Sequence, residues 1–203
     1  KLIKQKSSAS YLIFTSVFLL FAISELLLNN AEIINQVSQI FHVLSVFVNL
    51  FLIRDLFSSK ELPNLISNQF INTTFYISSG FVFLILIAFN FGNYNPQIIL
   101  GIFLLIWTND SFAYLIGKNF GKQKLFASIS PKKTVEGFLG GVFFSAIGSY
   151  FIALIAPSLS FTNWLIISVL VSVFGTLGDL VESKYKRQAS VKDSGKIMPG
   201  HGG

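Results

Sequence analysis

Cysteine is absent from all 203 residues of the sequence. Disulfide bonds, thiolate metal sites and a cysteine nucleophile are therefore excluded within this sequence. Charged residues are also scarce, because Asp, Glu, Lys and Arg together make up 12% of the chain, which is about half of their usual share in a soluble domain. So few charges cannot provide the polar surface that a soluble protein of this length presents to water.

Apolar residues are abundant instead. Hydrophobic residues make up 52% of the chain, and the mean hydropathy is +0.66. The 23 Phe residues are spread through long runs of Leu, Ile and Val, so lipid is expected to be the main solvent. Because backbone groups in lipid must bond internally, we predict an all-α fold, a polytopic bundle of transmembrane helices.

Six apolar stretches are long enough to cross about 30 Å of hydrocarbon at about 1.5 Å per residue. They cover roughly residues 11 to 28, 32 to 53, 70 to 91, 97 to 117, 137 to 156 and 163 to 182. The first stretch follows Lys1, Lys4 and Lys6, as a signal peptide would. No small-residue cleavage site ends it and the second stretch follows at once, so we expect a retained helix.

The basic residues orient these spans. All 15 Lys and Arg residues lie in the segments 1 to 10, 54 to 69, 118 to 136 and 183 to 203. With the N-terminus inside, all four segments are inner, which is the positive-inside rule. We therefore expect a multi-pass protein of the inner (cell) membrane whose polar site faces the cytoplasm.

The character of the chain changes near residue 97, after which polar residues enter the spans and the inner loops lengthen. We expect N-terminal transmembrane helices in residues 1 to 96, which hold spans one to three. A catalytic transmembrane region with cytoplasmic basic loops is expected in residues 97 to 203. No repeat or linker separates the two, so one integrated membrane domain is the simplest organisation.

Asp110 lies within the fourth span, roughly 10 Å from its inner end. A charged side chain at the bilayer centre costs about 3 kcal/mol on insertion scales, so such residues usually face a partner, an ion or a water-filled cavity. The alternative is a structural hydrogen bond or a neutral carboxylic acid inside the bundle.

A second acidic group lies at the inner end of the sixth span. Asp179 and Glu182 are three residues apart, and Ser183 and Lys186 continue the same helical face. The carboxylates could ligate Mg²⁺ while Lys186 contacts a phosphate. The alternative is a helix end at which Glu182 and Lys186 merely pair at a spacing of four.

The inner loop 118 to 136 is basic. Ser130-Pro131 resembles a helix N-cap followed by proline at the first helical position. A helix start flanked by Lys132 and Lys133 would attract anions, although lysines here could also serve only topology and lipid headgroups. The small residues Gly137, Gly141 and Ser145 indicate close helix packing.

The last segment, 183 to 203, combines basic residues with Asp193 and a glycine-rich turn around His201. Cationic side chains, an Asp and a flexible turn would suit a polyphosphate and its metal. His42, within an apolar span, is by contrast expected to be a packed or hydrogen-bonded structural residue.

The polar motifs of residues 97 to 203 occur in a characteristic order. They are Trp107-x-x-Asp110-x-x-Ala113-Tyr114, Ser130-Pro131-Lys132-Lys133-Thr134-x-Glu136-Gly137, Gly178-Asp179-Leu180-x-Glu182-Ser183, Ser183-x-x-Lys186-Arg187-x4-Lys192-Asp193 and Pro199-Gly200-His201-Gly202-Gly203. Together they resemble the signature of phosphatidate cytidylyltransferases, also called CDP-diacylglycerol synthases. The family signature continues into an Asp-Arg-x-Asp segment, so we expect a C-terminally truncated sequence that lacks part of the acid set and whose activity as a fragment is left open.

The resemblance implies a nucleotidyltransferase of phospholipid biosynthesis that converts CTP and phosphatidate to CDP-diacylglycerol and pyrophosphate. It implies Mg²⁺ at Asp179 and Asp193, with a second cation left open. The implied catalytic residues are Asp110, Asp179, Glu182, Lys186, Asp193 and His201. The implied nucleotide-binding residues are Lys132, Lys133, Ser183, Arg187 and Lys192. The expected partners are CTP, phosphatidate and membrane lipid, with no nucleic acid, and a homodimer is left open.

Two other functions fit parts of this pattern. A transporter or flippase of an anionic phosphorylated substrate would also use intramembrane acids and a basic vestibule. The sequence has no detectable inverted repeat, however, and its polar groups gather at one face. A CTP-dependent kinase of a polyprenol or similar lipid alcohol is the nearer alternative, and it would be distinguished by its products.

Overall fold

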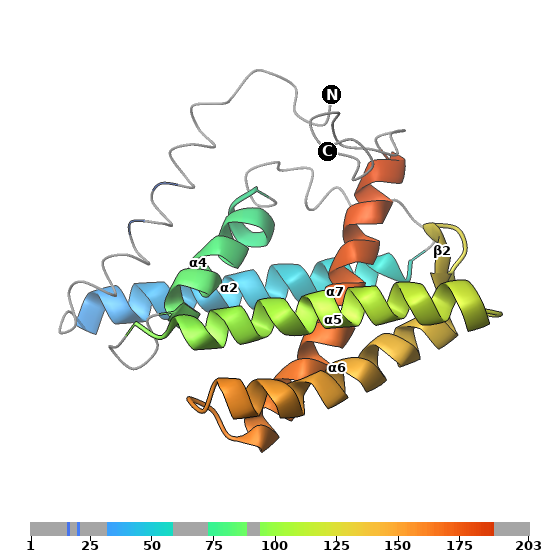
Figure 1. Ribbon diagram of the computed structural model, residues 1–203. Coiled ribbons are helices and arrows are strands. Elements are labelled where there is room, and N and C mark those ends of the chain that lie inside the picture. Colours follow the sequence, from blue (N-terminus) through green and yellow to red (C-terminus); the bar gives the residue numbers. More distant parts are fainter. Residues whose placement is uncertain (1–15, 17–19, 21–31, 59–72, 89–93, 189–203) are drawn as a thin grey trace. The chain divides into compact units, whose positions relative to one another are not determined.

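The computed structural model describes residues 16, 20, 32–58, 73–88 and 94–188 (Figure 1). The chain forms two compact units, Lys1–Asn95 and Pro96–Gly203. Helices dominate the described residues of both units. The predicted helical membrane fold is therefore confirmed in its main feature.

The described helices of the first unit are α2 (Glu32–Leu56), the π-helix η2 (Thr73–Ser78) and α4 (Ser79–Ala88). The Asn49 side chain on α2 donates a hydrogen bond to the Phe75 carbonyl oxygen of η2 at 3.3 Å. The His42 ring lies 5.2 Å from the Phe83 ring, measured between centroids. His42 thus packs against a neighbouring aromatic ring, as the sequence analysis predicted.

The described elements of the second unit are α5 (Pro96–Phe120), β1 (Lys124–Phe126), β2 (Ser130–Thr134), α6 (Val135–Ile155) and α7 (Phe161–Gln188). Helices α5 and α6 lie side by side, and α7 crosses both at a steep angle (Figure 1). The two strands form an antiparallel hairpin in which Lys124 faces Thr134. Since α5 and α7 end near this hairpin and α6 begins at it, the polar ends of all three helices come together there.

Small residues let α5 and α6 approach closely. Gly137, Gly141 and Ser145 are buried at every fourth position of α6. A Cβ atom added at Gly141 would lie 2.7 Å from Asn109 Oδ1 on α5, and the Ser145 hydroxyl donates to the Leu105 carbonyl oxygen at 3.4 Å. The interpretation of this stripe as a close packing surface is confirmed.

Four described helices are long and apolar enough to cross a membrane. These candidate spans are Gln39–Leu56, Pro96–Phe120, Val135–Ile155 and Phe161–Gln188. They coincide with the second, fourth, fifth and sixth predicted spans. The third predicted span contains the shorter apolar helix Phe75–Ala88, and the first, residues 11 to 28, falls almost wholly outside the described residues.

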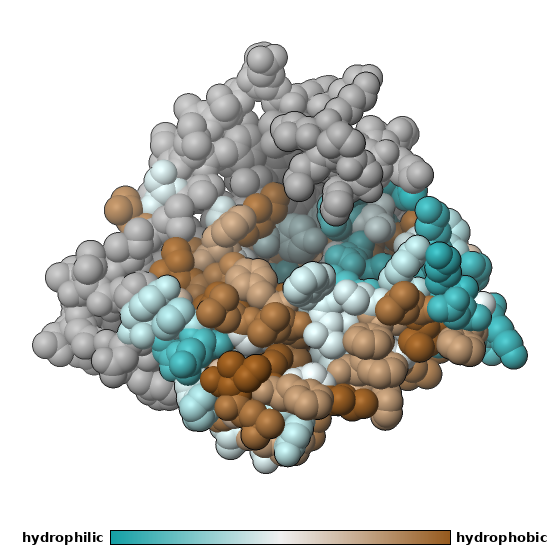
Figure 2. Space-filling model, viewed as in Figure 1, coloured by the Kyte–Doolittle hydropathy of each residue, from teal (hydrophilic) through white to brown (hydrophobic). Residues whose placement is uncertain are grey.

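The outer surface of the second unit is apolar along the helices. Exposed side chains include Phe103, Phe143, Phe151 and Phe174. Figure 2 shows this hydrophobic surface, with hydrophilic side chains gathered at the hairpin end. An apolar surface of this extent is favourable in contact with lipid and unfavourable in contact with water. Together with the four candidate spans, it indicates an integral membrane protein.

The helix predicted to start at Ser130-Pro131 is wrong. Residues Ser130–Thr134 form strand β2, and α6 begins at Val135. The true N-cap is Thr134, whose hydroxyl oxygen accepts a hydrogen bond from the Gly137 N–H at 3.1 Å. A two-stranded hairpin has only edge strands, where the missing N–H of Pro131 is tolerated. The all-α prediction therefore missed one small β element.

Candidate active site

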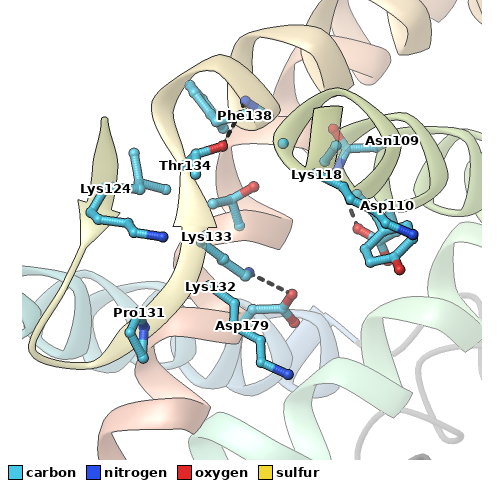
Figure 3. A pocket seen from close by; sticks show the side chains of 16 residues that line it. Asn109, Asp110, Lys118, Lys124, Pro131, Lys132, Lys133, Thr134, Phe138 and Asp179 are labelled. Carbon is cyan, nitrogen blue, oxygen red and sulfur yellow. Dashed lines mark hydrogen bonds and ion pairs between the residues drawn. The ribbon is translucent and has the colours of Figure 1, made fainter. Parts of the chain in front are cut away.

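A cavity of about 480 Å³ lies at the hairpin end of the second unit. Helices α5, α6 and α7 and both strands contribute to its wall (Figure 3). Its lining residues are Asn109, Asp110, Ala113, Tyr114, Gly117, Lys118, Lys124, Leu125, Pro131, Lys132, Lys133, Thr134, Gly137, Phe138, Thr176 and Asp179. A volume of this size is within the usual range of small-molecule sites.

An ion pair crosses the cavity from β2 to α7. The Lys133 ammonium group donates a hydrogen bond to Asp179 Oδ2 at 2.8 Å. The Asp179 side chain is 56% exposed, so the pair lies within reach of solvent and of a ligand. Both residues were predicted site residues, and the structure brings them into direct contact.

Asp110 belongs to the same cavity. The amide nitrogen of Asn109 donates to Asp110 Oδ1 at 3.2 Å, and Asn109 itself is buried between the helices. Asp110 is also within electrostatic range of Asp179 and Lys133. The intramembrane acid thus faces a polar cavity and has a buried neighbour that orients it.

The cavity is rich in positive charge. Four lysines, Lys118, Lys124, Lys132 and Lys133, line it together with the two aspartates. The Lys118 ammonium group also lies over the Tyr114 ring, 5.8 Å from its centroid. A cavity in which cations outnumber carboxylates favours an anion, and it could hold a polyphosphate together with its metal ion.

Two of these lysines, Lys118 and Lys124, were not named as site residues by the sequence analysis. Both belong to the basic loop 118 to 136, so their charge was visible in the sequence. Lys118 lies in the last turn of α5, beyond the predicted end of that span. For Lys124 the hairpin was missing from the prediction, because the register that pairs Lys124 with Thr134 places β1 beside the cavity. Composition alone does not distinguish a lysine that lines a cavity from one that faces water.

Four predicted residues of α7 lie outside the lining of this cavity: Glu182, Ser183, Lys186 and Arg187. Glu182 and Lys186 form an ion pair of 2.8 Å, which was the alternative raised for this helix end. Arg187 donates to the Ile129 carbonyl oxygen at the turn of the hairpin, with 3.5 Å between the atoms. In this arrangement Glu182 and Lys186 pair along α7, and Arg187 joins α7 to the hairpin beside the cavity.

Three further predicted residues, Lys192, Asp193 and His201, lie outside the described residues. Within the described part of the chain, no group of three or more His, Asp or Glu side chains is placed to hold a metal ion. Asp110 and Asp179 nevertheless line one cavity. Since Mg²⁺ is commonly held by one or two carboxylates plus substrate phosphates, this donor set fits a magnesium-bound polyphosphate.

The family model described as the Cytidylyltransferase family matches residues 1–203, the whole chain. The chain belongs to this family. Membership in the cytidylyltransferase family agrees with a cavity that combines lysines with two aspartates. The match includes the motifs around Asp110, Lys133 and Asp179.

The chain is also similar to curated proteins named phosphatidate cytidylyltransferase. It is 46% identical to the Bacillus subtilis protein over 129 residues, which cover 63% of this chain and 48% of the relative. It is 45% identical over 130 residues to the Staphylococcus saprophyticus protein, with the same shares covered. For the Staphylococcus haemolyticus protein, identity is 48% over 107 residues, 52% of this chain and 41% of the relative. The chain thus spans about half the length of the curated relatives it matches.

Proposed function

We propose that the full-length protein is a phosphatidate cytidylyltransferase, which transfers CMP from CTP to phosphatidate. A phosphate oxygen of phosphatidate forms a bond to the α-phosphorus of CTP, and the bond from that phosphorus to the β-phosphate oxygen breaks. The products are CDP-diacylglycerol and pyrophosphate. The observation that carries the proposal is the lysine-rich cavity with two aspartates in a chain of the cytidylyltransferase family.

The proposed reaction needs little general-base catalysis. A phosphate monoester is already largely ionised near neutral pH, so the attacking oxygen needs no strong proton acceptor. The reaction requires alignment of two anionic substrates and neutralisation of the charge on the leaving pyrophosphate. Lysines that are preorganised around a cavity provide both.

The lysines of the hairpin are proposed to bind the triphosphate. Lys132 and Lys133 extend from β2 toward the cavity (Figure 3). Lys133 is held at 2.8 Å from Asp179, so its ammonium group is preorganised near the acids. Lys186, Arg187 and Lys192 remain proposed phosphate ligands, with Lys192 outside the described residues.

Asp179 and Asp193 are proposed to hold Mg²⁺, with Asp193 outside the described residues, and Asp110 is a further acid in the same cavity as Asp179. A bound Mg²⁺ would neutralise the phosphates of the nucleotide and orient them for attack. Lys133 bonds to one oxygen of the Asp179 carboxylate, and within the described residues no second cation is paired with Asp179. Glu182, Ser183 and His201 are proposed to support this site, and a second cation stays a prediction.

The proposed topology has six spans with the N-terminus inside. All Lys and Arg residues lie in the four inner segments of that topology, and the cavity lies where α5 and α7 end and α6 begins. These observations support a site at the cytoplasmic face of the cell membrane, at the headgroup level where phosphatidate presents its phosphate. Homodimer formation also stays a prediction.

Transfer of label from CTP into lipid tests the proposal. The full-length protein and its Asp179→Ala variant would be incubated with Mg²⁺, phosphatidate micelles and CTP labelled at the α-phosphate. Label in the lipid fraction that disappears in Asp179→Ala supports the cytidylyltransferase. Lipid label only from γ-labelled CTP would instead identify a lipid kinase, and no lipid label from the folded protein would favour transport.

A further inference from the structure

Glu136 holds the chain segment that precedes β1. Its carboxylate accepts a hydrogen bond from the Lys122 N–H at 3.0 Å and from the Gln123 N–H at 3.1 Å. Both bonds join a charged acceptor to backbone donors, which makes them stronger than neutral hydrogen bonds. The first turn of α6 is thereby fastened to the start of the hairpin.

A backbone hydrogen bond also joins the start of α6 to the residue before β1. The Val135 N–H donates to the Gln123 carbonyl oxygen at 2.9 Å, and the next residue, Lys124, pairs with Thr134. Strand β1 has only three residues, and isolated two-stranded hairpins are marginally stable in water. The position of β1 therefore depends on the bonds at its start, of which Glu136 supplies the charged ones.

Lys124 is the first residue of β1 and lines the cavity. Figure 3 shows its amino group directed from β1 toward β2, on the side of Lys133, which lines the same cavity. Lys133 is paired with Asp179, whereas no acid among the described residues forms an ion pair with Lys124. The charge of Lys124 is thus available to an anionic ligand.

We propose that Glu136 is a positioning residue that holds Lys124 in the cavity wall, where Lys124 binds a phosphate of the nucleotide. The identity of the anion rests on the proposed function. Glu136 does not line the cavity and acts through the backbone of residues 122 and 123. Lys124 thus has a ligand-binding role, and Glu136, which follows the motif Lys132-Lys133-Thr134, has the role of holding Lys124 in place.

The test is a double-mutant cycle in the full-length protein, with KM for CTP and for phosphatidate measured separately. Lys124→Ala and Glu136→Ala are each expected to raise KM for CTP about 10- to 100-fold, the usual loss when a supporting residue of a site is removed. KM for phosphatidate should stay unchanged. Because both variants disable the same ammonium group, the double variant should exceed Lys124→Ala by less than about twofold.

Lys122→Ala is the matched control, because it removes a neighbouring lysine that does not line the cavity and keeps the backbone N–H that Glu136 binds. Its KM for CTP should equal that of the unmodified protein. A merely structural role of Glu136 would lower the amount of active enzyme and leave KM unchanged. An unchanged KM in Lys124→Ala, or effects that multiply in the double variant, would overturn the proposal.

Two further experiments apply if Glu136→Ala does not fold or if the unmodified protein is inactive. If Glu136→Ala does not fold, Glu136→Gln takes its place, since its single side-chain oxygen can still accept one of the two bonds and should give an intermediate KM. If the unmodified protein transfers no CMP, the proposed function fails, and inorganic pyrophosphate becomes the probe. Weaker pyrophosphate binding in Lys124→Ala and Glu136→Gln than in Lys122→Ala would support the positioning role, and equal binding would refute it.

Discussion

Lys133 and Asp179 are 46 residues apart in the chain, yet Lys133 Nζ lies 2.8 Å from Asp179 Oδ2. The pair joins strand β2 to helix α7 across the cavity. Each partner orients the other, so a cation from the basic loop and an acid from α7 occupy one site before any ligand binds. Such preorganisation is what charge-stabilising catalysis requires.

Replacing Lys133 should harm catalysis more than stability. Lys133→Met removes the charge but keeps most of the side-chain length, and we expect kcat/KM to fall about a hundredfold, as for other preorganised donors. The free energy of unfolding should change by less than about 1 kcal/mol, because the pair is partly exposed. Label transfer and thermal unfolding in detergent measure the two quantities, and a destabilised but fully active variant would contradict the assignment.

Asp110→Asn should also lower activity, while stability stays unchanged or rises. The amide keeps the size of the side chain but removes a carboxylate from a membrane-spanning helix, where a charge costs up to about 3 kcal/mol on insertion scales. We expect a protein that is equally or more resistant to heat and has lost most CMP transfer. If the variant unfolded more easily and kept its turnover, Asp110 would have only a structural role.

Magnesium dependence should identify Asp179 as a metal ligand. Chelation of Mg²⁺ should abolish CMP transfer by the full-length protein, and Asp179→Asn should raise the half-saturating Mg²⁺ concentration about tenfold or more. Ser160→Ala is a suitable control, because it removes a helix-capping bond to the Asn163 N–H and Ser160 does not line the cavity. Equal magnesium curves for Asp179→Asn and the control would exclude Asp179 as a ligand.

Gly141→Ala should disturb both packing and the site. An added Cβ would lie 2.7 Å from Asn109 Oδ1 and 3.0 Å from the Asn109 carbonyl oxygen, so α5 and α6 must separate. Overpacking of this kind costs about 1–3 kcal/mol, and displacement of Asn109 also disturbs Asp110. Gly175→Ala is the control on α7. Apart from its chain neighbours and the backbone of its own helical turns, no described atom lies within 4 Å of the added Cβ, so the melting temperature of this variant should not fall.

The helical part of the fold could be predicted because apolar length alone specifies a membrane span. The predicted ends were less accurate, since α5 continues to Phe120 and α7 to Gln188, beyond residues 117 and 182. Hydropathy marks only the apolar part of a helix, and both helices continue into polar residues. The small-residue stripe was also recognised, because its spacing of four has few meanings in a membrane helix.

The hairpin could not be predicted from the same patterns. Strands of three and five residues give too short a pattern for periodicity, and Ser130-Pro131 resembles the start of a helix. Missing the hairpin also concealed the position of Lys124. The contact between Lys133 and Asp179 was equally hidden, because both residues were named but their distance depends on how β2 and α7 pack.

Four serines of α6 and α7 are buried, Ser145, Ser149, Ser168 and Ser172, and their hydrogen bonds differ in whether they resist sliding of one helix along another. Ser149, Ser168 and Ser172 donate to carbonyl oxygens of their own helices, so these hydroxyls oppose no axial shift. Of these four buried serines, Ser145 is the one that donates to another helix, at Leu105. Ser145 and the close approach of Gly141 to Asn109 thus fix α6 against the stretch of α5 that precedes Asp110, and a larger residue at position 141 or 145 would shift Asp110 relative to α6.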